Sequence, residues 1–280
     1  MSDNADPDVI RVSYEGRVAV LTIDNAKKLN ALSVGQYYDL AVKLSEIAKR
    51  DDIYVTLLTA NGRFFSACNS GADVSLAEGT PLGHGRDAHR HWLRSFVANN
   101  LNIARAFYTH PKILVVGLNG PAIGLSAALV GFADFVYCTP STFLLTPFSS
   151  LGLVAEGGAS LGLVQRLGRS KANEALIMSK RISSAELLQT GFVNAIFDGE
   201  DAASDAAFHK RVLREIDDRL GDHLIGDSML GIKRLIRRAD DETLDRQNVS
   251  EVFAGLDRFM TGVPQEEFRK LAMGEKRHKL

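Results

Sequence analysis

A single carboxylate in an apolar segment is the residue of this chain best suited to acid–base chemistry. Glu156 lies between the apolar run 151–155 and the pair Gly157-Gly158, just before a segment with helical periodicity. Apolar surroundings raise the pKa of a carboxyl group toward the working range of a general base. The glycines allow close approach by a substrate, and the coming helix N-terminus directs N–H groups at what binds there. An ordinary acidic residue at a helix start gives the same pattern, so the segment alone leaves both interpretations open.

Other reactive side chains are scattered along the chain. The two cysteines, Cys68 and Cys138, are too few for a disulfide framework or a metal cluster and indicate a reducing compartment. His89 and His91 are spaced to face opposite sides of a helix, so we expect no metal site.

The composition excludes several classes of protein. The chain has 280 residues, 45% hydrophobic and 24% charged, with a net charge of −1. These values are typical of one large globular domain, or a domain with a tail, and do not favour nucleic acid or an anionic membrane surface as partner. The longest apolar stretch, residues 113–136, is interrupted by Asn119-Gly120-Pro121, so no membrane span is predicted.

The elements that must position Glu156 alternate along the chain. Apolar β-branched runs predict strands over residues 9–14, 18–23, 53–59, 113–118, 135–138, 142–145 and 192–197. Helical periodicity predicts helices over residues 33–49, 91–108, 124–130, 202–220, 225–237 and 242–260. Ser33 is the expected N-cap of the first helix. This alternation favours an α/β fold with a largely parallel sheet and a helical last third.

Five segments in order resemble the signature of the crotonase superfamily, the enoyl-CoA hydratases and isomerases. They are Lys28-Leu29-Asn30-Ala31-Leu32, Gly62-Arg63-Phe64-Phe65-Ser66, Ser70-Gly71-Ala72-Asp73, Leu118-Asn119-Gly120-Pro121-Ala122-Ile123-Gly124 and Gly191-Phe192-Val193-Asn194-Ala195. Each is weak alone, but together they cover roughly residues 9–200 with the family's order and spacing. Segments 118–129 and 147–158 and the chain's last residues most resemble the Δ3,Δ2-enoyl-CoA isomerases of fungal peroxisomes.

The resemblance implies a fold, an assembly and a substrate. The fold is the ββα superhelix of ClpP and crotonase for residues 1–200, followed by a helical region, 201–280, that serves trimerisation and ends in a targeting tail. The assembly is a homotrimer or a hexamer built as a dimer of trimers. The substrate is an acyl-CoA thioester, so coenzyme A belongs to the substrate and no separate cofactor is expected.

The resemblance also assigns binding residues. The N–H groups of Ala72 and Leu125 would form an oxyanion hole for the thioester oxygen, and such preorganised donors typically contribute about 3–4 kcal/mol each. The other substrate-binding positions would be Ser70, Gly71, Asp73, Val74, Asn100 and Lys28. Asn100 would orient Glu156 or a water, although an exposed asparagine is the commoner reading. Lys28, with Lys27, would lie near the CoA phosphates, although a solvated lysine pair gives the same sequence.

The absence of two carboxylates argues against some of the family's reactions. The two glutamates of family hydratases would fall at Ala128 and near Phe148, and both positions are apolar here. The extra acids of the family's dienoyl-CoA isomerases are also missing from this region. Moving one double bond needs a single base, which removes a proton from C2 and returns it at C4. An apolar wall of Phe148, Leu151, Leu153 and Val154 would keep water from the intermediate.

We therefore predict a Δ3,Δ2-enoyl-CoA isomerase of the β-oxidation of unsaturated fatty acids, with Glu156 as base and acid. The alternatives are a hydratase or another CoA-thioester enzyme of the family, and a non-catalytic acyl-CoA-binding relative. One departure from the family is Ala67-Cys68-Asn69, which looks like an insertion before the Ala72 loop.

The C-terminus predicts the compartment. The chain ends in His278-Lys279-Leu280, similar to the Ser-Lys-Leu signal that a peroxisomal import receptor reads. A basic tail that ends in leucine by chance is the alternative. The prediction is a peroxisomal protein.

Overall fold

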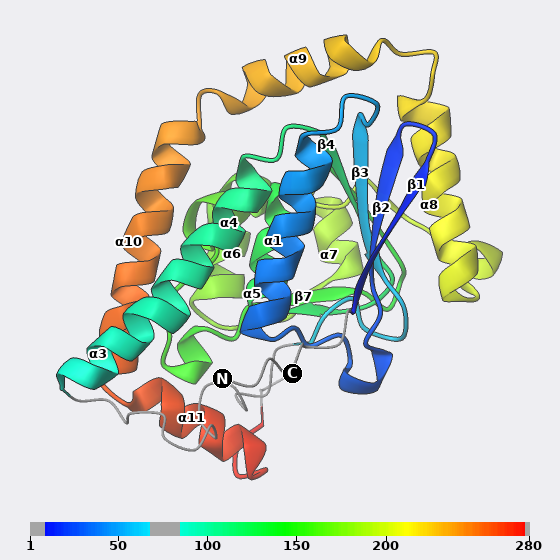
Figure 1. The fold of residues 1–280 in the computed structure, drawn as a ribbon. Coiled ribbons are helices and arrows are strands. Elements are labelled where there is room, and N and C mark those ends of the chain that lie inside the picture. Colours follow the sequence, from blue (N-terminus) through cyan, green and yellow to red (C-terminus); the bar gives the residue numbers. More distant parts are fainter. Residues whose placement is uncertain (1–8, 68–84, 278–280) are drawn as a thin grey trace.

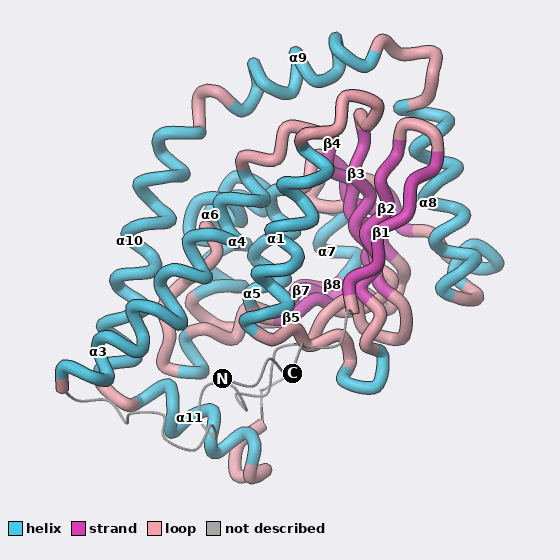
Figure 2. The backbone as a smooth tube through the Cα atoms, in the orientation of Figure 1, coloured by secondary structure: helices cyan, strands magenta, loops and turns pink. Residues whose placement is uncertain are grey.

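The computed structural model describes residues 9–67 and 85–277. Its main sheet has six strands in the order β1-β2-β3-β4-β6-β9 (Figures 1 and 2). The strands are β1 (Ile10–Glu15), β2 (Val18–Ile23), β3 (Val55–Ala60), β4 (Ile113–Leu118), β6 (Phe135–Cys138) and β9 (Ala195–Ile196). Only β1 is antiparallel to its neighbour, and each later pair is parallel. The predicted parallel sheet is confirmed, although the strand expected over 192–197 is only two residues long.

Helices cover both faces of this sheet, which explains why β3 and β4 are continuous buried runs. On one face lie α1 (Val34–Ala48) and α4 (Ala98–Tyr108), which pack against each other. On the other face lies α8 (Asp205–Leu220), whose Phe208, Val212 and Ile216 join a core cluster with strand residues such as Val115. The predicted N-cap is confirmed, because Ser33 forms a capping box with Gln36.

The chain also forms a second, smaller sheet, whose strands are interspersed in sequence with the last strands of the main sheet. It consists of β5 (Ala122–Ile123), β7 (Phe143–Leu145) and β8 (Ile182–Ser183). Three helices adjoin these strands: the short α5 (Leu125–Leu129) after β5, the longer α6 (Ala159–Leu176) between β7 and β8, and the short α7 (Ser184–Gln189) after β8. Single 3₁₀ turns lie at Ala26–Lys28, Val130–Phe132, Ser149–Leu151 and Gly199–Ala202. This sheet therefore holds α5 and α6, the two helices that begin beside the predicted catalytic segment.

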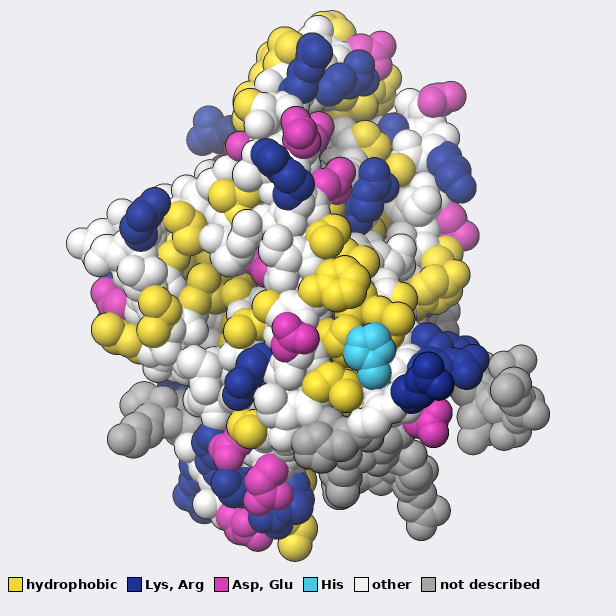
Figure 3. Space-filling model, turned by 90° about the vertical axis from the view of Figure 1, so that its left-hand side faces the viewer, with side chains coloured by type: hydrophobic (Ala, Val, Ile, Leu, Met, Phe, Trp, Pro, Cys, Tyr) yellow, Lys and Arg dark blue, Asp and Glu magenta, His cyan; other side chains and the backbone are white. Residues whose placement is uncertain are grey.

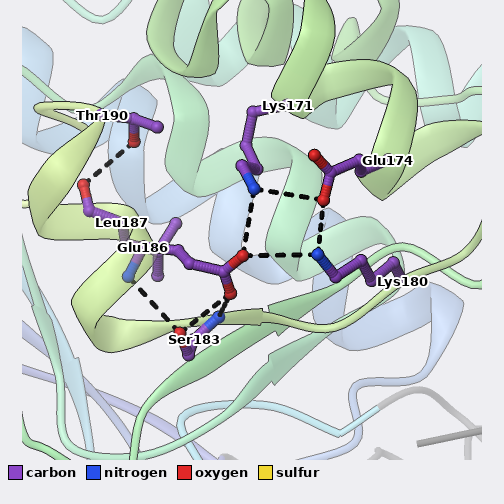
Figure 4. Close-up of polar contacts among 7 residues, drawn as sticks. All are labelled: Lys171, Glu174, Lys180, Ser183, Glu186, Leu187 and Thr190. Atoms are coloured by element: carbon purple, nitrogen blue, oxygen red, sulfur yellow. Dashed lines mark hydrogen bonds and ion pairs between the residues drawn. The ribbon is translucent and has the colours of Figure 1, made fainter.

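An ion-pair network ties α6 to α7 (Figure 4). Lys171 and Lys180 each contact both Glu174 and Glu186. Glu186 also accepts hydrogen bonds from the backbone N–H and the hydroxyl of Ser183, the N-cap of α7. The network fixes the C-terminal half of α6 on the small sheet.

Helices of the last third wrap around this core. In Figure 1, α9 (Gly226–Arg237) crosses above the sheet, α10 (Asp241–Met260) descends along α4, and α11 (Val263–Ala272) lies below. α10 also contacts α3 (Arg86–Trp92) and a π-helical turn, Leu93–Val97. The helix predicted over 91–108 thus begins at residue 86 and contains a π-turn, a feature often found at functional sites. No helix in the described ranges is both long and apolar enough to cross a membrane.

Candidate active site

A mostly apolar cavity of about 140 Å³ opens beside Glu156. Among the described residues that line it, Glu156 is the only carboxylate. The lining residues are Leu32, Val34, Tyr37, Ser95, Phe96, Asn99, Asn100, Ile103, Ile123, Leu125, Leu153, Glu156, Phe259 and Phe268. They come from β5, α1, the π-turn, α4, α5, α10 and α11 and from the loops beside these elements, so the C-terminal helices complete the cavity that the small sheet begins.

A tight turn aims Glu156 at this cavity. Gly157 and Gly158 have φ angles of 68° and 74°, the left-handed region that favours glycine. A Cβ atom at Gly157 would lie 2.6 Å from Leu125 Cδ1, and one at Gly158 would lie 2.7 Å from Phe132 Cζ. α6 begins at the next residue. The two glycines are therefore required by the packing of the turn as well as by its backbone angles.

Asn100 holds the Glu156 carboxyl group from the opposite wall. Its Nδ2 donates to Glu156 Oε2 at 2.9 Å, and its Oδ1 accepts from the Gly157 N–H at 3.1 Å. Asn100 is only 5% exposed, so the reading of this residue as a surface asparagine is wrong. Because the side chain binds both the carboxyl group and the next peptide, it orients Glu156.

The surroundings of Glu156 raise its pKa to the range of a general base that works near neutral pH. Removal from bulk water raises the pKa of Glu156 to about 7, the negative charge of Glu251 adds to the increase, and the Asn100 hydrogen bond opposes it. Glu156 is not fully buried and lines the cavity. A proton can therefore be taken from, and returned to, a molecule bound there.

The structure places one of the two predicted oxyanion donors. Leu125 is the first residue of α5 and lines the same cavity as Glu156. An N–H group at this position has no acceptor within its own helix and is free to bind a ligand oxygen. The second predicted donor, Ala72, lies outside the described residues, as do Ser70, Gly71, Asp73 and Val74. Cys68 and Asn69 of the apparent insertion lie outside them too.

Buried hydroxyl groups link the Leu125 turn to α1. Tyr37 Oη and Ser126 Oγ are 2.8 Å apart, and Ser126 Oγ donates to Ser66 Oγ at 2.8 Å. Ser66 Oγ in turn donates to the carbonyl of Asn30 at 2.9 Å. This chain fixes the start of α5 relative to the segment that leads into residues 68–84. Tyr37 and Ser126 were missed at the sequence level, because residues 89 apart carry no local sign of contact.

The structure explains one residue in each of two family motifs, Asn30 in the segment 28–32 and Gly120 in the segment 118–124. Asn30 has a φ of 56° and donates from Nδ2 to the carbonyls of Asn61 and Phe64, both at 2.7 Å. Gly120 lies so close to Arg63 that a Cβ atom would be 2.2 Å from its carbonyl oxygen. Both motifs thus lock the segments around the site together.

Other predicted positions differ in their roles. Ala128 and Phe148 are buried core residues and lie outside the cavity lining, so the hydratase positions carry no carboxylate. Of the predicted apolar wall, only Leu153 lines the cavity, while Phe148 and Leu151 are buried in the core. Lys28 is exposed at the end of a 3₁₀ turn, as a lysine on a CoA phosphate or a solvated lysine would be.

Helix α10 supplies groups that the sequence analysis missed. Phe259 lines the cavity, and Glu251 accepts hydrogen bonds at the start of α6. The signal was present for Glu251, because it shares the apolar face of α10 with Leu244, Val252 and Phe259. A carboxylate on the buried stripe of an amphipathic helix needs a partner, which the sequence does not name.

Comparison with known proteins agrees with this geometry. The family model described as enoyl-CoA hydratase/isomerase matches residues 13–218. A protein of Pyricularia oryzae named Delta(3,5)-Delta(2,4)-dienoyl-CoA isomerase is 64% identical over 97% of this chain and 99% of its own length. A 3,2-trans-enoyl-CoA isomerase of Saccharomyces cerevisiae is 34% identical over 96% and 97%. A mouse protein named Enoyl-CoA delta isomerase 3, peroxisomal, is 26% identical over 93% and 76%.

A solved structure confirms the fold. The enoyl-CoA hydratase/isomerase of Pseudoalteromonas atlantica has a TM-score of 0.80 and 27% identity, with 97% of this chain and 100% of that one covered. The predicted α/β fold with a helical C-terminal region is thus confirmed. The chain belongs to the enoyl-CoA hydratase/isomerase family, the crotonase superfamily.

Proposed function

We propose that the protein is an enoyl-CoA isomerase that converts 3-enoyl-CoA thioesters into 2-enoyl-CoA thioesters. One observation carries the proposal: Glu156, with a pKa of about 7, is the single carboxylate in the described lining of a mostly apolar cavity that Leu125, the first residue of α5, also lines. The relative named 3,2-trans-enoyl-CoA isomerase supports the same reaction.

The reaction needs one proton carrier and one anion site. The Glu156 carboxylate takes a proton from C2, and the electrons of that C–H bond form a dienolate whose charge rests on the thioester oxygen. The N–H groups of Leu125 and Ala72 would stabilise this oxygen. The carboxylic acid then returns the proton at C4, the double bond moves to C2–C3, and the carboxylate is restored. The apolar walls keep water away from the intermediate.

A second candidate is the conversion of 3,5-dienoyl-CoA into 2,4-dienoyl-CoA. The 64% identity to a protein named for that reaction favours it. The proton would have to reach C6 instead of C4, and the described lining of the cavity offers no carboxylate besides Glu156. The absence of the extra acids from the sequence argues against this reaction. The 64% sequence identity supports it, so it is the alternative to test.

One set of assays separates these reactions. We expect purified protein to isomerise 3-hexenoyl-CoA and to hydrate crotonyl-CoA negligibly. A separate assay with 3,5-octadienoyl-CoA tests the dienoyl-CoA alternative. Glu156→Gln should lower isomerisation by about 10²–10⁴-fold, the range for a lost general base, while acyl-CoA binding is kept. Hydration as fast as isomerisation, or turnover by the Gln variant close to wild type, contradicts the proposal.

We also propose that the chain assembles into a homotrimer or hexamer through α9. This helix directs charged groups inward: Lys233 Nζ donates to Asp134 and to the Lys112 carbonyl, both at 2.6 Å, and Arg237 binds Asp134 at 3.0 Å. Ile232, Leu235 and Ile236 of the same helix are exposed. Ile232 and Ile236 also border a cavity between α9 and the main sheet, so Leu235 is the most outward of the three. Three large apolar side chains exposed on one helix are typical of a surface that contacts another protein chain.

The side of the molecule formed by α3 and α10 has exposed apolar side chains as well. Figure 3 shows a hydrophobic area across the middle of this face, and the large exposed apolar residues of α10 are Val249 and Phe253. Two distinct apolar surfaces on one chain are what a closed ring of copies requires.

A peroxisomal location is the last part of the proposal, with His278-Lys279-Leu280 as the import signal. The mouse relative named as peroxisomal supports it. Deletion of Lys279 and Leu280 should leave the purified enzyme active and a fluorescent fusion in the cytosol. Peroxisomal import of the truncated fusion would contradict this assignment.

A further inference from the structure

Helix α6 begins without a cap from its own sequence. Its N-cap residue is Gly158, which has no side chain to accept a hydrogen bond. The first N–H groups of a helix need an acceptor when they are buried. Here the acceptor comes from a segment 93 residues further along, Glu251 of α10.

Glu251 uses both carboxylate oxygens on this turn. Oε2 accepts from the Gly158 N–H at 2.7 Å, and Oε1 accepts from the Ser160 N–H at 2.8 Å and from the Ser160 hydroxyl at 2.5 Å. Gln247, one helical turn before Glu251, donates to the same hydroxyl at 2.6 Å. Because each oxygen accepts from an N–H at a positive helix end, these hydrogen bonds favour the anionic form of Glu251.

This contact begins two residues after Glu156. The turn is therefore held from two sides, with Asn100 of α4 on Glu156 and Gly157 and with Glu251 of α10 on Gly158 and Ser160. Glu251 is 5% exposed and is absent from the described lining of the cavity, so a bound molecule does not touch it there.

We infer that Glu251 is a positioning residue for the isomerisation: it anchors the Gly157-Gly158 turn to α10 and keeps its negative charge behind Glu156. The inference rests on the proposed function, because it assigns Glu251 a role through Glu156. The anchor also joins the C-terminal helices to the reacting group, since α10 carries Phe259 into the same cavity.

The charge of Glu251 favours the protonated form of Glu156. This interaction adds to the effect of burial in raising the pKa of Glu156, while Asn100 opposes it. Burial also raises the pKa of Glu251, against the hydrogen bonds from Ser160 and Gly158. Of the other described residues around the cavity, α1 contributes the titratable Tyr37, and the groups from α4, α10 and α11 are neutral.

The test is the pH dependence of kcat/KM in Glu251→Gln. The amide keeps the shape of the side chain but turns an N–H₂ group toward one of the helix donors and removes the charge. We expect kcat to fall about tenfold with KM changed by less than about twofold. The acidic limb of the profile should move down by about half a pH unit or more, because Glu156 then ionises at lower pH.

Matched variants separate this role from a merely structural one. Glu251→Asp retains the charge, so its acidic limb should stay where the wild-type limb lies even if kcat falls. Glu242→Gln removes a carboxylate from an exposed position on the same helix and should leave both kcat and the limb unchanged. A limb that does not move in Glu251→Gln, or one that moves equally in Glu242→Gln, overturns the inference.

A measurement without turnover keeps the inference separate from the proposed function. The Glu156 carboxyl carbon can be titrated by ¹³C NMR, with its signal assigned by its loss in Glu156→Gln. A lower Glu156 pKa in Glu251→Gln supports the positioning role even if 3-hexenoyl-CoA proves not to be a substrate. An unchanged Glu156 titration overturns it, whatever the isomerase assay shows.

Discussion

Burial of the Glu156 carboxylate serves the proposed reaction but lowers the stability of the fold near neutral pH. Its pKa in the folded chain is about 7 against an ordinary value of 4.5, mainly because the protein removes it from bulk water. A raised folded-state pKa stabilises the fold below the unfolded pKa, and this stabilisation is lost as the pH rises through the folded value. The free energy of unfolding should therefore fall between about pH 4.5 and pH 7 on account of this residue.

Glu156→Gln should reverse that loss. The amide keeps an acceptor for Asn100 and has no charge to bury, so at pH 8 the variant should be more stable than wild type by at most about 3 kcal/mol. At pH 4 the two should be equally stable. Urea unfolding at fixed protein concentration, at both pH values, measures the difference. A gap of the same size at pH 4 would mean that charge is not its cause.

Asn100→Ala should shift the pH profile in the opposite direction to Glu251→Gln. The Asn100 hydrogen bond lowers the pKa of Glu156, so its loss should move the acidic limb of kcat/KM to higher pH and lower kcat about tenfold. Asn102→Ala, at an exposed position of the same helix, is the control and should match wild type. A downward shift in Asn100→Ala would contradict the assigned direction.

Single residues were predictable where a local pattern marked them. Glu156 was identified by its apolar and glycine-rich neighbours, and Leu125 by the resemblance to a family. Asn100 was a predicted substrate-binding position, but the sequence could not distinguish an exposed asparagine from one that binds Glu156. Glu251 was missed because its partners lie 91 and 93 residues away, and only the packing of α10 brings them together.

At the scale of elements, the α6–α7 junction depends on Glu186. The Ser183 hydrogen bonds and the contact with Lys171 lower the pKa of Glu186 to about 2, so its contribution is present above about pH 4.5 and lost as the pH falls toward 2. Glu186→Ala should cost about 1–1.5 kcal/mol at pH 7, less than a direct conversion of the shift, because water screens the lysine pairs.

The matched variant for this junction is Glu174→Ala. Glu174 contacts the same two lysines but caps no helix, so its loss should destabilise the protein clearly less than the loss of Glu186. Thermal unfolding of both variants at pH 7 and pH 3 tests the distinction. Equal losses would show that the ion pairs, and not the cap, stabilise α7.

Elements with local stop and start signals were predicted well. The hairpin of β1 and β2 and the cap at Ser33 follow from turn and capping chemistry. The start of α3 was missed, because its N-cap Gly85 offers no side-chain acceptor. The π-turn at Leu93–Val97 has no local signature, since its extra residue is accommodated by packing of Phe96 against Phe259 of α10.

At the scale of the whole molecule, the C-terminal helices have two roles that the sequence did not separate. α8 covers a face of the sheet, and α10 and α11 close the Glu156 cavity, so residues 201–280 do more than the predicted assembly and targeting. α9 lies across the top of the molecule (Figure 1), and its Ile232, Leu235 and Ile236 are exposed. Periodicity predicted this helix but could not show that Lys233 and Arg237 point inward to Asp134.

Replacing the exposed apolar residues of α9 should therefore dissociate the proposed assembly. Leu235 is 72% exposed on the described chain, and burying such a side chain contributes about 1.5–3 kcal/mol. We expect wild-type protein to have about three or six times the 30.5 kDa mass of one chain, and Leu235→Glu with Ile236→Glu to shift toward one. Light scattering after size exclusion measures both masses.

Ser228→Glu is the matched control for this variant, because it adds a charge at an exposed position of the same helix without removing apolar area. Its mass should equal that of wild type. Lys233 and Arg237 remain in the double variant, so α9 should stay anchored to Asp134 and the unfolded fraction should not rise. If the double variant kept the wild-type mass, or if wild type had the mass of one chain, the outer face of α9 would not be an interface between copies.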